Sequence, residues 1–343
     1  MAGCFRLFDL NEKCIKTVLQ CTELFDLISF SLCSKKRLAN VRSLKLQIKN
    51  LGICCSNIFY ARYDFGGNEN YLVFCEDGYD REIALSDNRP RRLQVNYIEG
   101  TSFTEHLHRQ DGNPVQHWRK ANFRGNDWLR HFMDIFNCDK IDSMHVQESK
   151  FEIDSVVDIV QNLNIANLLT FQNVTKPYTL SLLKAQPCLE DLNVHSLTLD
   201  DPSEYSILLR NQQYLTVRTE AKITLDIVLS VNSLTLNCFG LSIKDVNRFI
   251  KLWKKGANPR LRCLCVSRYY AHPAAAVVFN ENEVLRGVQY KRVPLGTVRM
   301  LDVFENRMEI HGGFDITGKS GRKATVILSN QYGYSSLRMY IWQ

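Results

Sequence analysis

The chain has 343 residues, of which 45% are hydrophobic and 23% are charged, and its formal net charge is +7. That composition is typical of a globular protein with a sizeable core, and the length predicts two or three domains. No apolar run reaches the roughly 18 residues that a membrane span requires, so a membrane partner is not expected. The modest positive charge fits an acidic partner and does not require nucleic acid.

Twelve cysteines are scattered along the chain without any paired C-x-x-C spacing. Many of them stand inside apolar runs, where a cysteine behaves as a small hydrophobic residue. Charged side chains such as Arg6, Asp9 and Glu12 occupy the first turns, a pattern that argues against a signal peptide. We therefore expect the protein in a reducing compartment, the cytoplasm or the nucleus.

Residues 5–36 carry two short apolar helical patterns. In the first pattern, Ile15, Val18 and Leu19 recur at i, i+3 and i+4, which predicts an amphipathic helix, and Leu10 lies just upstream. Two or three helices of this length cannot close a core by themselves. Their spare apolar faces must therefore contact the rest of the chain or another protein.

The second pattern runs from Asp26 to Ser34 and contains Leu27 and Phe30. Asp26 precedes the apolar run, in a position where aspartate is a favoured N-cap. The polar sequence that begins at Ser34 is expected to end this helix.

Residues 1–43 resemble an F-box, the helical module that docks on the Skp subunit of SCF-type (Skp, cullin, RING) ubiquitin ligases. The sequence DLISFSLCSK, from Asp26 to Lys35, is similar to a large nematode F-box group. That family usually has Leu-Pro where this chain has Leu10-Asn11, so a side-chain cap replaces a proline entry. The resemblance implies a Skp-binding set of eight residues: Leu10, Ile15, Val18, Leu19, Asp26, Leu27, Phe30 and Ser34.

Residues 44–138 predict a small antiparallel β-rich region with a closing helix. Two aromatic and β-branched runs flank Gly66-Gly67-Asn68, which predicts a hairpin. The expected elements are strands at 41–48, 58–64, 70–76, 81–85 and 92–98, a surface loop at 101–126 and a helix at 127–138.

Residues 140–275 repeat a strand-plus-helix pattern. Apolar pairs recur at steps of 19 to 30 residues, at Met144/Val146, Leu169/Phe171, Leu192/Val194, Leu215/Val217, Leu234/Leu236 and Leu264/Val266. Repeats of this length are the signature of leucine-rich-repeat solenoids, whose strands form a parallel sheet. A compact α/β domain with coincidental spacing is the alternative, and both predict parallel strands that alternate with helices.

The last helix of this region has the clearest ends. Ser242 and Asp245 resemble a capping box in which aspartate replaces the usual Glu or Gln, and Gly256 suits the position just past the helix end. Residues 240–267 are similar to the nematode F-box-associated domain, and a looser similarity covers residues 185–239. That family is thought to bind the proteins that its ligase marks, which implies a target-binding role here.

Residues 285–343 return to strands and are expected to cap the end of the solenoid, because terminal repeats need a cover. The strands are expected within 288–294, 307–316, 323–329 and 337–343, with a hairpin loop at 316–323.

The sequence GFDITGKS, residues 313–320, satisfies the P-loop pattern letter for letter. A working P-loop is followed by a helix, whereas a strand-like run follows here, so we interpret the match as a hairpin turn. His106 and His108 have a spacing that some zinc sites use, but no matching Cys or carboxylate set stands nearby. We therefore predict no catalytic residue, no metal and no cofactor.

These observations predict a chain of mixed α+β and α/β class: F-box helices, a small antiparallel sheet, a leucine-rich-repeat-like solenoid and a C-terminal β cap. We expect a non-enzymatic adaptor that binds Skp, and through it a cullin–RING ligase, and that holds an unidentified target protein. Tethering both partners makes ubiquitin transfer effectively intramolecular. The alternatives are a repeat module with no ligase role, a nucleotide enzyme that uses the P-loop match, and a nucleic-acid binder.

Overall fold

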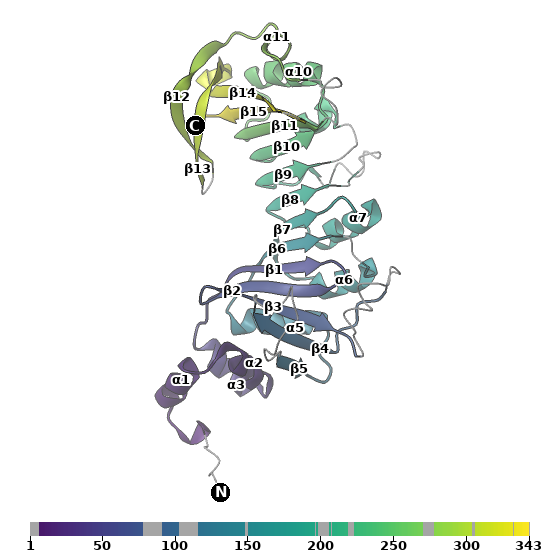
Figure 1. Ribbon diagram of the computed structural model, residues 1–343, viewed down its shortest axis with the longest axis vertical. Coiled ribbons are helices and arrows are strands. Elements are labelled where there is room, and N and C mark those ends of the chain that lie inside the picture. The colour runs from purple at the N-terminus through teal and green to yellow at the C-terminus, as the bar shows by residue number, and fades with distance from the viewer. Residues whose placement is uncertain are drawn as a thin grey trace. The chain divides into compact units, whose positions relative to one another are not determined.

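The structure is a computed structural model, and its fold is mixed α/β with a large sheet (Figure 1). The chain divides into two compact units, which we describe separately. The N-terminal unit comprises Met1–Leu169 and Leu180–Cys188, and the C-terminal unit comprises Thr170–Thr179 and Leu189–Gln343. The structure describes residues 7–77, 91–102, 116–147, 150–195, 197, 206, 208–218, 223–269, 278–303, 306–331 and 333–342.

The N-terminal unit opens with a 3-10 turn and three helices: η1 (Leu7–Asp9), α1 (Glu12–Gln20), α2 (Leu24–Leu32) and α3 (Lys35–Arg42). Asn11 is the N-cap of α1, and its side chain accepts a hydrogen bond from the Cys14 backbone N–H at 2.9 Å. The side-chain cap predicted from the exchange of proline for Asn11 is therefore confirmed.

One predicted helix start is wrong, and one predicted helix end is confirmed but has a second role. Asp26 is not an N-cap, because α2 begins at Leu24 after Glu23, which places Asp26 in the first turn. A carboxylate there still interacts favourably with the helix dipole. Ser34 does not simply end the second helix, because its hydroxyl accepts the Arg37 backbone N–H at 3.3 Å and so caps a third helix.

The strands of the N-terminal unit lie in the order β7-β6-β1-β2-β3-β4-β5. Their bounds are β1 (Lys49–Cys55), β2 (Phe59–Phe65), β3 (Asn68–Cys75), β4 (Tyr97–Ser102), β5 (Gln116–Arg119), β6 (Ile141–Val146) and β7 (Ile165–Thr170). From β1 to β5 the pairing is antiparallel, as predicted, whereas β1 pairs with β6 in parallel. Gly66 and Gly67, with φ of +61° and +85°, make the turn of the β2–β3 hairpin, which is also confirmed.

Several of the expected elements in this region differ from the structure. The strand expected at 41–48 is wrong because α3, which Ser34 caps, runs through its start. The strand expected at 92–98 begins only where β4 does, and part of the loop expected at 101–126 forms β5. The strand expected at 81–85 lies outside the described residues.

Two helices of the N-terminal unit, α5 (Gly125–Ile135) and α6 (Ile153–Val160), follow the antiparallel strands. The helix expected at 127–138 is confirmed as α5, which buries Trp128 and Phe132. A further helix, α7 (Lys176–Ala185), contains residues of both units.

The strands of the C-terminal unit lie in the order β8-β9-β10-β11-β15-β14-β13-β12. Their bounds are β8 (Asp191–Val194), β9 (Tyr214–Val217), β10 (Thr235–Phe239), β11 (Cys263–Tyr269), β12 (Lys291–Val303), β13 (Asn306–Thr317), β14 (Lys323–Gln331) and β15 (Tyr334–Ile341). The helices are α9 (Leu225–Ser230), α10 (Ile243–Lys254) and α11 (Glu281–Val284). Strands β8 to β11 pair in parallel, and α9 and α10 connect β9, β10 and β11, so the predicted parallel strand–helix alternation is confirmed from β9 to β11.

The ends of α10 are formed by the residues that the sequence indicated. The Ser242 hydroxyl accepts the Asp245 backbone N–H at 3.0 Å and donates to the Asp245 carboxylate at 2.6 Å. Gly256 follows the helix with a φ of +109°, a conformation that glycine adopts without strain. Trp253 is buried, as expected for its place in the apolar stripe.

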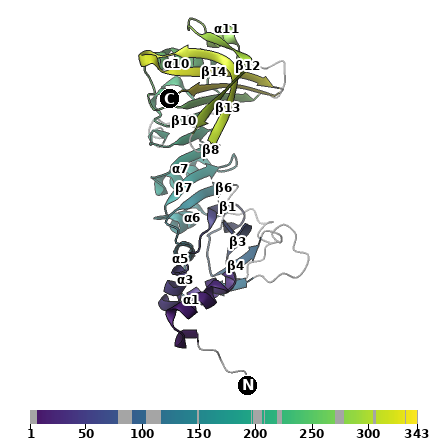
Figure 2. The same ribbon diagram turned by 90° about the vertical axis from the view of Figure 1, so that its left-hand side faces the viewer.

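The C-terminal strands extend the sheet of this unit, because β15 pairs antiparallel with β11. Strands β12 and β13 form a long two-stranded arm (Figures 1 and 2), and β12 is the edge strand. The pairing of this arm shifts register between Val293 and Val298, a stretch that contains Pro294. The Arg299 guanidinium holds the arm near its bend through hydrogen bonds of 2.9 and 3.0 Å to the Asp315 carboxylate.

Candidate functional site

Helix α2 is fixed to the sheet of the N-terminal unit. The indole Nε1 of Trp118 donates to Ser29 Oγ at 2.8 Å, and its ring meets that of Phe25 edge-on with centroids 5.6 Å apart. On the buried side, Ser31 Oγ lies 2.9 Å from His131 Nε2 of α5. These contacts join α2 to both β5 and α5.

Helix α3 contacts α5 through polar groups at the end of each helix. Asn137 Nδ2 donates to the Arg42 carbonyl at 3.3 Å, and the Arg42 guanidinium lies 3.7 Å from the Asp134 carboxylate. Both charged side chains are about half exposed, so their ion pair contributes only about 0–1 kcal/mol. Val41 is the buried apolar residue of this helix.

A group of apolar side chains on η1, α1 and α2 remains accessible to solvent. Phe8 and Val18 are each 38% exposed, and Phe8 stacks on the half-buried Phe30 with ring centroids 6.0 Å apart. The Arg37 guanidinium lies 5.6 Å from the Phe8 ring and 5.2 Å from the Phe30 ring. We call the set of Phe8, Leu10, Ile15, Val18 and Phe30 the N-terminal apolar group.

The structure places the eight predicted Skp-binding residues in three environments. The buried members are Leu19 and Leu27, the half-buried members are Leu10, Ile15 and Phe30, and the exposed members are Val18, Asp26 and Ser34. The buried leucines hold the helices together, whereas Val18 is free to contact a partner. Phe8 was not predicted from the sequence, because its position next to Phe30 follows only from the folded η1 turn. Skp binding by these residues stays a prediction.

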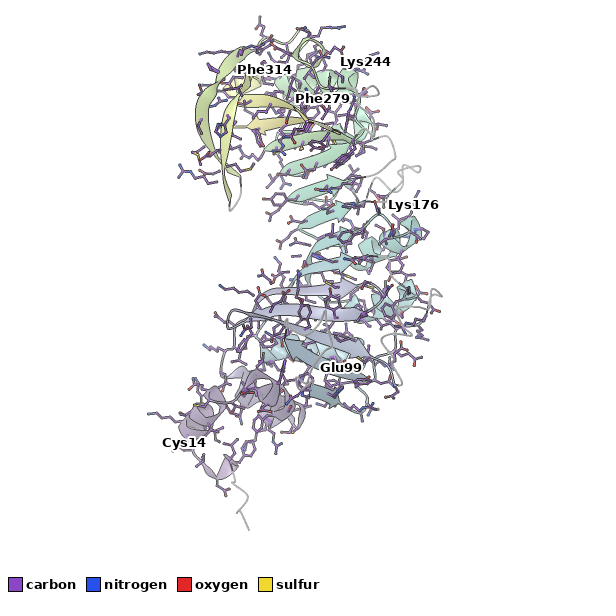
Figure 3. All side chains as sticks on the ribbon, viewed as in Figure 1. Cys14, Glu99, Lys176, Lys244, Phe279 and Phe314 are labelled. Atoms are coloured by element: carbon purple, nitrogen blue, oxygen red, sulfur yellow. The ribbon has the colours of Figure 1, made fainter. Side chains whose placement is uncertain are left out.

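The parallel strands of the C-terminal unit offer a second candidate surface. One face packs its apolar side chains against the helices, and these are Leu192, Val194, Leu215, Val217, Leu236, Cys238, Leu264 and Val266. Phe279, labelled in Figure 3, is buried on this helix side, where the Arg268 guanidinium lies 5.0 Å from its ring. The alternating residues form the opposite face, which we call the open face, and Asn237 Nδ2 donates there to Thr216 Oγ1 at 3.1 Å.

The arm covers one end of the open face. Leu301 and Ile310 of the arm form a buried apolar cluster with Cys263 and Tyr340, and the half-buried Trp342 packs against it. Cys263 is the first residue of β11, and Tyr340 is the penultimate residue of β15. The other end of the open face, where β11 ends, is not part of this cluster.

The P-loop match lies in a hairpin, as predicted. Strand β13 runs to Thr317, a 3-10 turn covers Lys319–Gly321, and β14 follows antiparallel to β13. The Gly318 backbone N–H closes the turn on the Arg322 carbonyl at 2.8 Å. The strand-then-helix order that cradles phosphate in a P-loop is therefore replaced by two paired strands.

The remaining candidates are a metal site and a membrane-spanning helix in the described part of the chain. Within those residues, no group of three or more His, Cys, Asp and Glu side chains is placed to hold a metal ion. The pair His106 and His108 lies outside the described residues. No helix of the described segments has both the length and the apolar character that crossing a bilayer requires.

Comparison with known proteins bears on the second candidate surface. A family model described as F-box associated matches residues 205–266, which include β9, β10 and α10. Residues 205–266 are therefore similar to the F-box-associated family, and we call them the F-box-associated segment. The resemblance noted for 240–267 lies almost wholly within this segment, which also covers part of the looser similarity over 185–239.

A protein of Caenorhabditis elegans, described as "F-box associated domain-containing protein sdz-33", is similar to this chain. The two are 27% identical over 183 residues, which is 52% of this chain and 53% of that protein. The chain thus spans about half of the length of this curated relative. No solved structure matches the chain. The comparisons support an F-box-associated family and leave the partners of this chain to be proposed.

Proposed function

We propose that this protein is a non-enzymatic substrate-recognition adaptor of an SCF-type ubiquitin ligase in the cytoplasm or nucleus. Its N-terminal helices dock on a Skp subunit, which brings the cullin and RING proteins. The unit that contains the F-box-associated segment holds a target protein on a leucine-rich-repeat-like parallel sheet, and the C-terminal strands close that sheet. The role is positional, because tethering target and ligase raises the effective concentration of target lysines at the ubiquitin thioester.

The observation that carries this proposal is the N-terminal apolar group next to a helix that is already fixed. The buried face of α2 packs against the sheet and α5. The exposed Val18 and Phe8 have no comparable role in the core. Burying an apolar side chain of this size in an interface stabilises it by roughly 1.5–3 kcal/mol. A separate subunit that covers this group would gain that energy.

The test is co-purification of the full chain with a Skp subunit. The wild type is expected to retain Skp, and a double variant, Phe8→Asp with Val18→Asp, is expected to lose it. Both positions are exposed, so the charges should not unfold the helices. Leu27→Asp is unsuitable for this purpose because Leu27 is only 3% exposed.

The matched control is Leu295→Asp, which places the same charge on an apolar residue of the arm that is 81% exposed. This variant is expected to bind Skp as the wild type does. Retention of Skp by the double variant at the wild-type level would contradict the docking assignment. If the wild type itself fails to bind Skp, the adaptor proposal is replaced by the alternative of a target-binding module without a ligase role.

A further inference from the structure

A row of aromatic and cationic side chains crosses the open face of the C-terminal unit at the end that the arm leaves uncovered. Its members come from successive strands or their ends, and we call them the ladder: Phe171, His195, Arg218, Phe239, Tyr269 and Tyr334. Five members have a buried neighbour on their strand, and Arg268, the neighbour of Tyr269, contacts the buried Phe279 on the helix side, so the ladder lies on one face.

Neighbouring members of the ladder contact one another at four of its five steps, and at the fifth the charge of Arg218 acts on the His195 imidazole. Phe171 stacks on His195 with centroids 5.8 Å apart, and the Arg218 guanidinium lies 5.6 Å from the Phe239 ring. The Phe239 ring stacks on that of Tyr269 at 5.5 Å with an interplanar angle of 12°.

The row ends on β15. The Tyr269 ring lies 5.2 Å from that of Tyr334, whose hydroxyl lies 2.8 Å from Ser267 Oγ. Each ring is therefore held by a neighbour before any partner arrives. Such pre-organisation lowers the entropy cost of binding, since little side-chain freedom remains to be lost.

The ladder is accessible and carries a positive charge at Arg218. Tyr269 is 68% exposed, which is unusual for so large a ring, and Arg218 is exposed. Within the described residues, no carboxylate forms an ion pair with Arg218 or with the exposed Arg338 of the same face. Burial and the charge of Arg218 lower the pKa of His195, so His195 is neutral at pH 7 and adds no charge.

The dimensions of the ladder fit an extended polypeptide. The row crosses five strand-to-strand steps of about 4.8 Å each, which gives a length of roughly 24 Å. An extended chain advances about 3.3 Å per residue, so about seven residues span the row. Tyrosine and arginine are also the residue types that dominate the energetics of protein interfaces.

We propose that the ladder binds an extended acidic segment of the target protein, with carboxylates at Arg218 and aromatic side chains against the Phe239 and Tyr269 rings. This proposal rests on the proposed function, because it identifies the surface on which the adaptor holds its target. The carboxylates of the segment neutralise Arg218, and its aromatic side chains extend a stack that already exists.

Single-stranded nucleic acid is disfavoured by the same geometry. Base stacking needs free ring faces along a groove lined with cations that follow the phosphates. Here Arg218 is the single cation among the six members of the ladder, so these members do not form the row of cations that would follow a phosphate backbone. Binding of RNA in place of an acidic peptide is an outcome that would overturn the proposal.

The experiment measures the affinity of the full chain for a fluorescent synthetic peptide in which glutamate and tyrosine alternate, by fluorescence anisotropy. The comparison probes are a peptide of alternating lysine and tyrosine and a short oligouridylate. We expect the wild type to bind the acidic peptide at least about tenfold more tightly than either comparison probe. Equal or tighter binding of the lysine peptide or of the RNA overturns the proposal.

Two variants locate the site on the ladder. Arg218→Glu is expected to weaken binding of the acidic peptide by about tenfold or more, and Tyr269→Ala by about fivefold. The matched control is Arg248→Glu, an identical charge change at an exposed position of α10 on the helix side, expected to stay within about twofold. Equal weakening by Arg248→Glu, or none by Arg218→Glu, places the peptide elsewhere and overturns the proposal.

The outcome is separable from that of the Skp experiment. Arg218→Glu is expected to retain Skp, because the N-terminal apolar group is untouched. Ladder-dependent peptide binding without Skp binding keeps the surface and removes the ligase role. If Arg218→Glu loses its cooperative thermal transition, Tyr269→Ala decides the matter, since Tyr269 is mostly exposed.

Discussion

Helices α1 and α2 have nine residues each and follow one another along the chain, but only α2 is built into the body of its unit. Helix α2 buries Leu27 and Ile28 and is bonded to Trp118, whereas α1 buries Leu19 and exposes Val18. This difference shows that apolar periodicity predicts a helix but does not indicate what covers its apolar face. Burial in the folded chain separates the residues that hold the fold from those left for a partner.

Among the tests of this difference between α1 and α2, the largest change in stability is expected from Leu27→Asp. Burying an unpaired carboxylate in place of a packed leucine should reduce the free energy of unfolding by roughly 4 kcal/mol. Urea unfolding followed by tryptophan fluorescence measures it, because Trp118 packs on α2. The control, Val18→Asp on α1, should change the same quantity by less than about 0.5 kcal/mol. Similar costs at the two positions would show that both helices belong to the core.

A smaller effect is expected from the pH dependence of His131, which contacts Ser31 of α2. Burial first, and then the charge of Lys120, lower the pKa of His131 to about 4, so the folded protein holds a neutral imidazole. The unfolded chain takes up a proton near pH 6.5. This contribution to stability is therefore complete above pH 6.5 and is lost as the pH falls towards 4.

The measurement for His131 is urea unfolding at several pH values between 7.5 and 4. His131→Gln retains a hydrogen-bonding group and does not titrate, so the difference between wild type and variant isolates the histidine. We expect the wild type to lose more stability than the variant over this range. An equal decrease of the free energy of unfolding with pH in the wild type and the variant would mean that His131 is not held neutral by burial.

The smallest effect is expected from Asn11→Ala, which removes the N-cap of α1. Loss of such a cap costs about 1 kcal/mol, and this should speed backbone hydrogen exchange in α1 by about fivefold. The exchange of α2 should not change, because α2 is fixed independently of α1. Asn11→Ser keeps a capping oxygen and serves as the control. Faster exchange in both helices would show that they unfold together.

Local patterns in the sequence predicted the elements whose ends depend on neighbouring residues. The β2–β3 hairpin followed from Gly66-Gly67, and both observed φ values are positive. The helix α10 followed from Ser242 and Gly256, which occupy the two helix ends as expected. Parallel strands β8 to β11 followed from the spacing of apolar pairs, because each pair faces the same side of the sheet.

The features that the sequence did not predict depend on which residues meet in three dimensions. The helix end before Ser34 was predicted, but the helix that begins after Ser34 was not, because α3 is short and depends on its packing against α5. In the same way, Phe239 and Tyr269 are 30 positions apart, and only the register of β10 on β11 stacks them. The ladder is therefore a product of strand pairing and has no motif of its own.

The interrupted edge strand of the arm has a consequence for how the protein behaves at high concentration. An edge strand of 13 residues would ordinarily offer, on its outer side, a row of backbone donors to which another molecule adds a strand of its own. Pro294 has no backbone N–H to offer, and the register shift beside it breaks the straight run that such an addition needs. The arm thus ends the sheet in a form that resists polymerisation, although Leu295 beside the proline is almost wholly exposed.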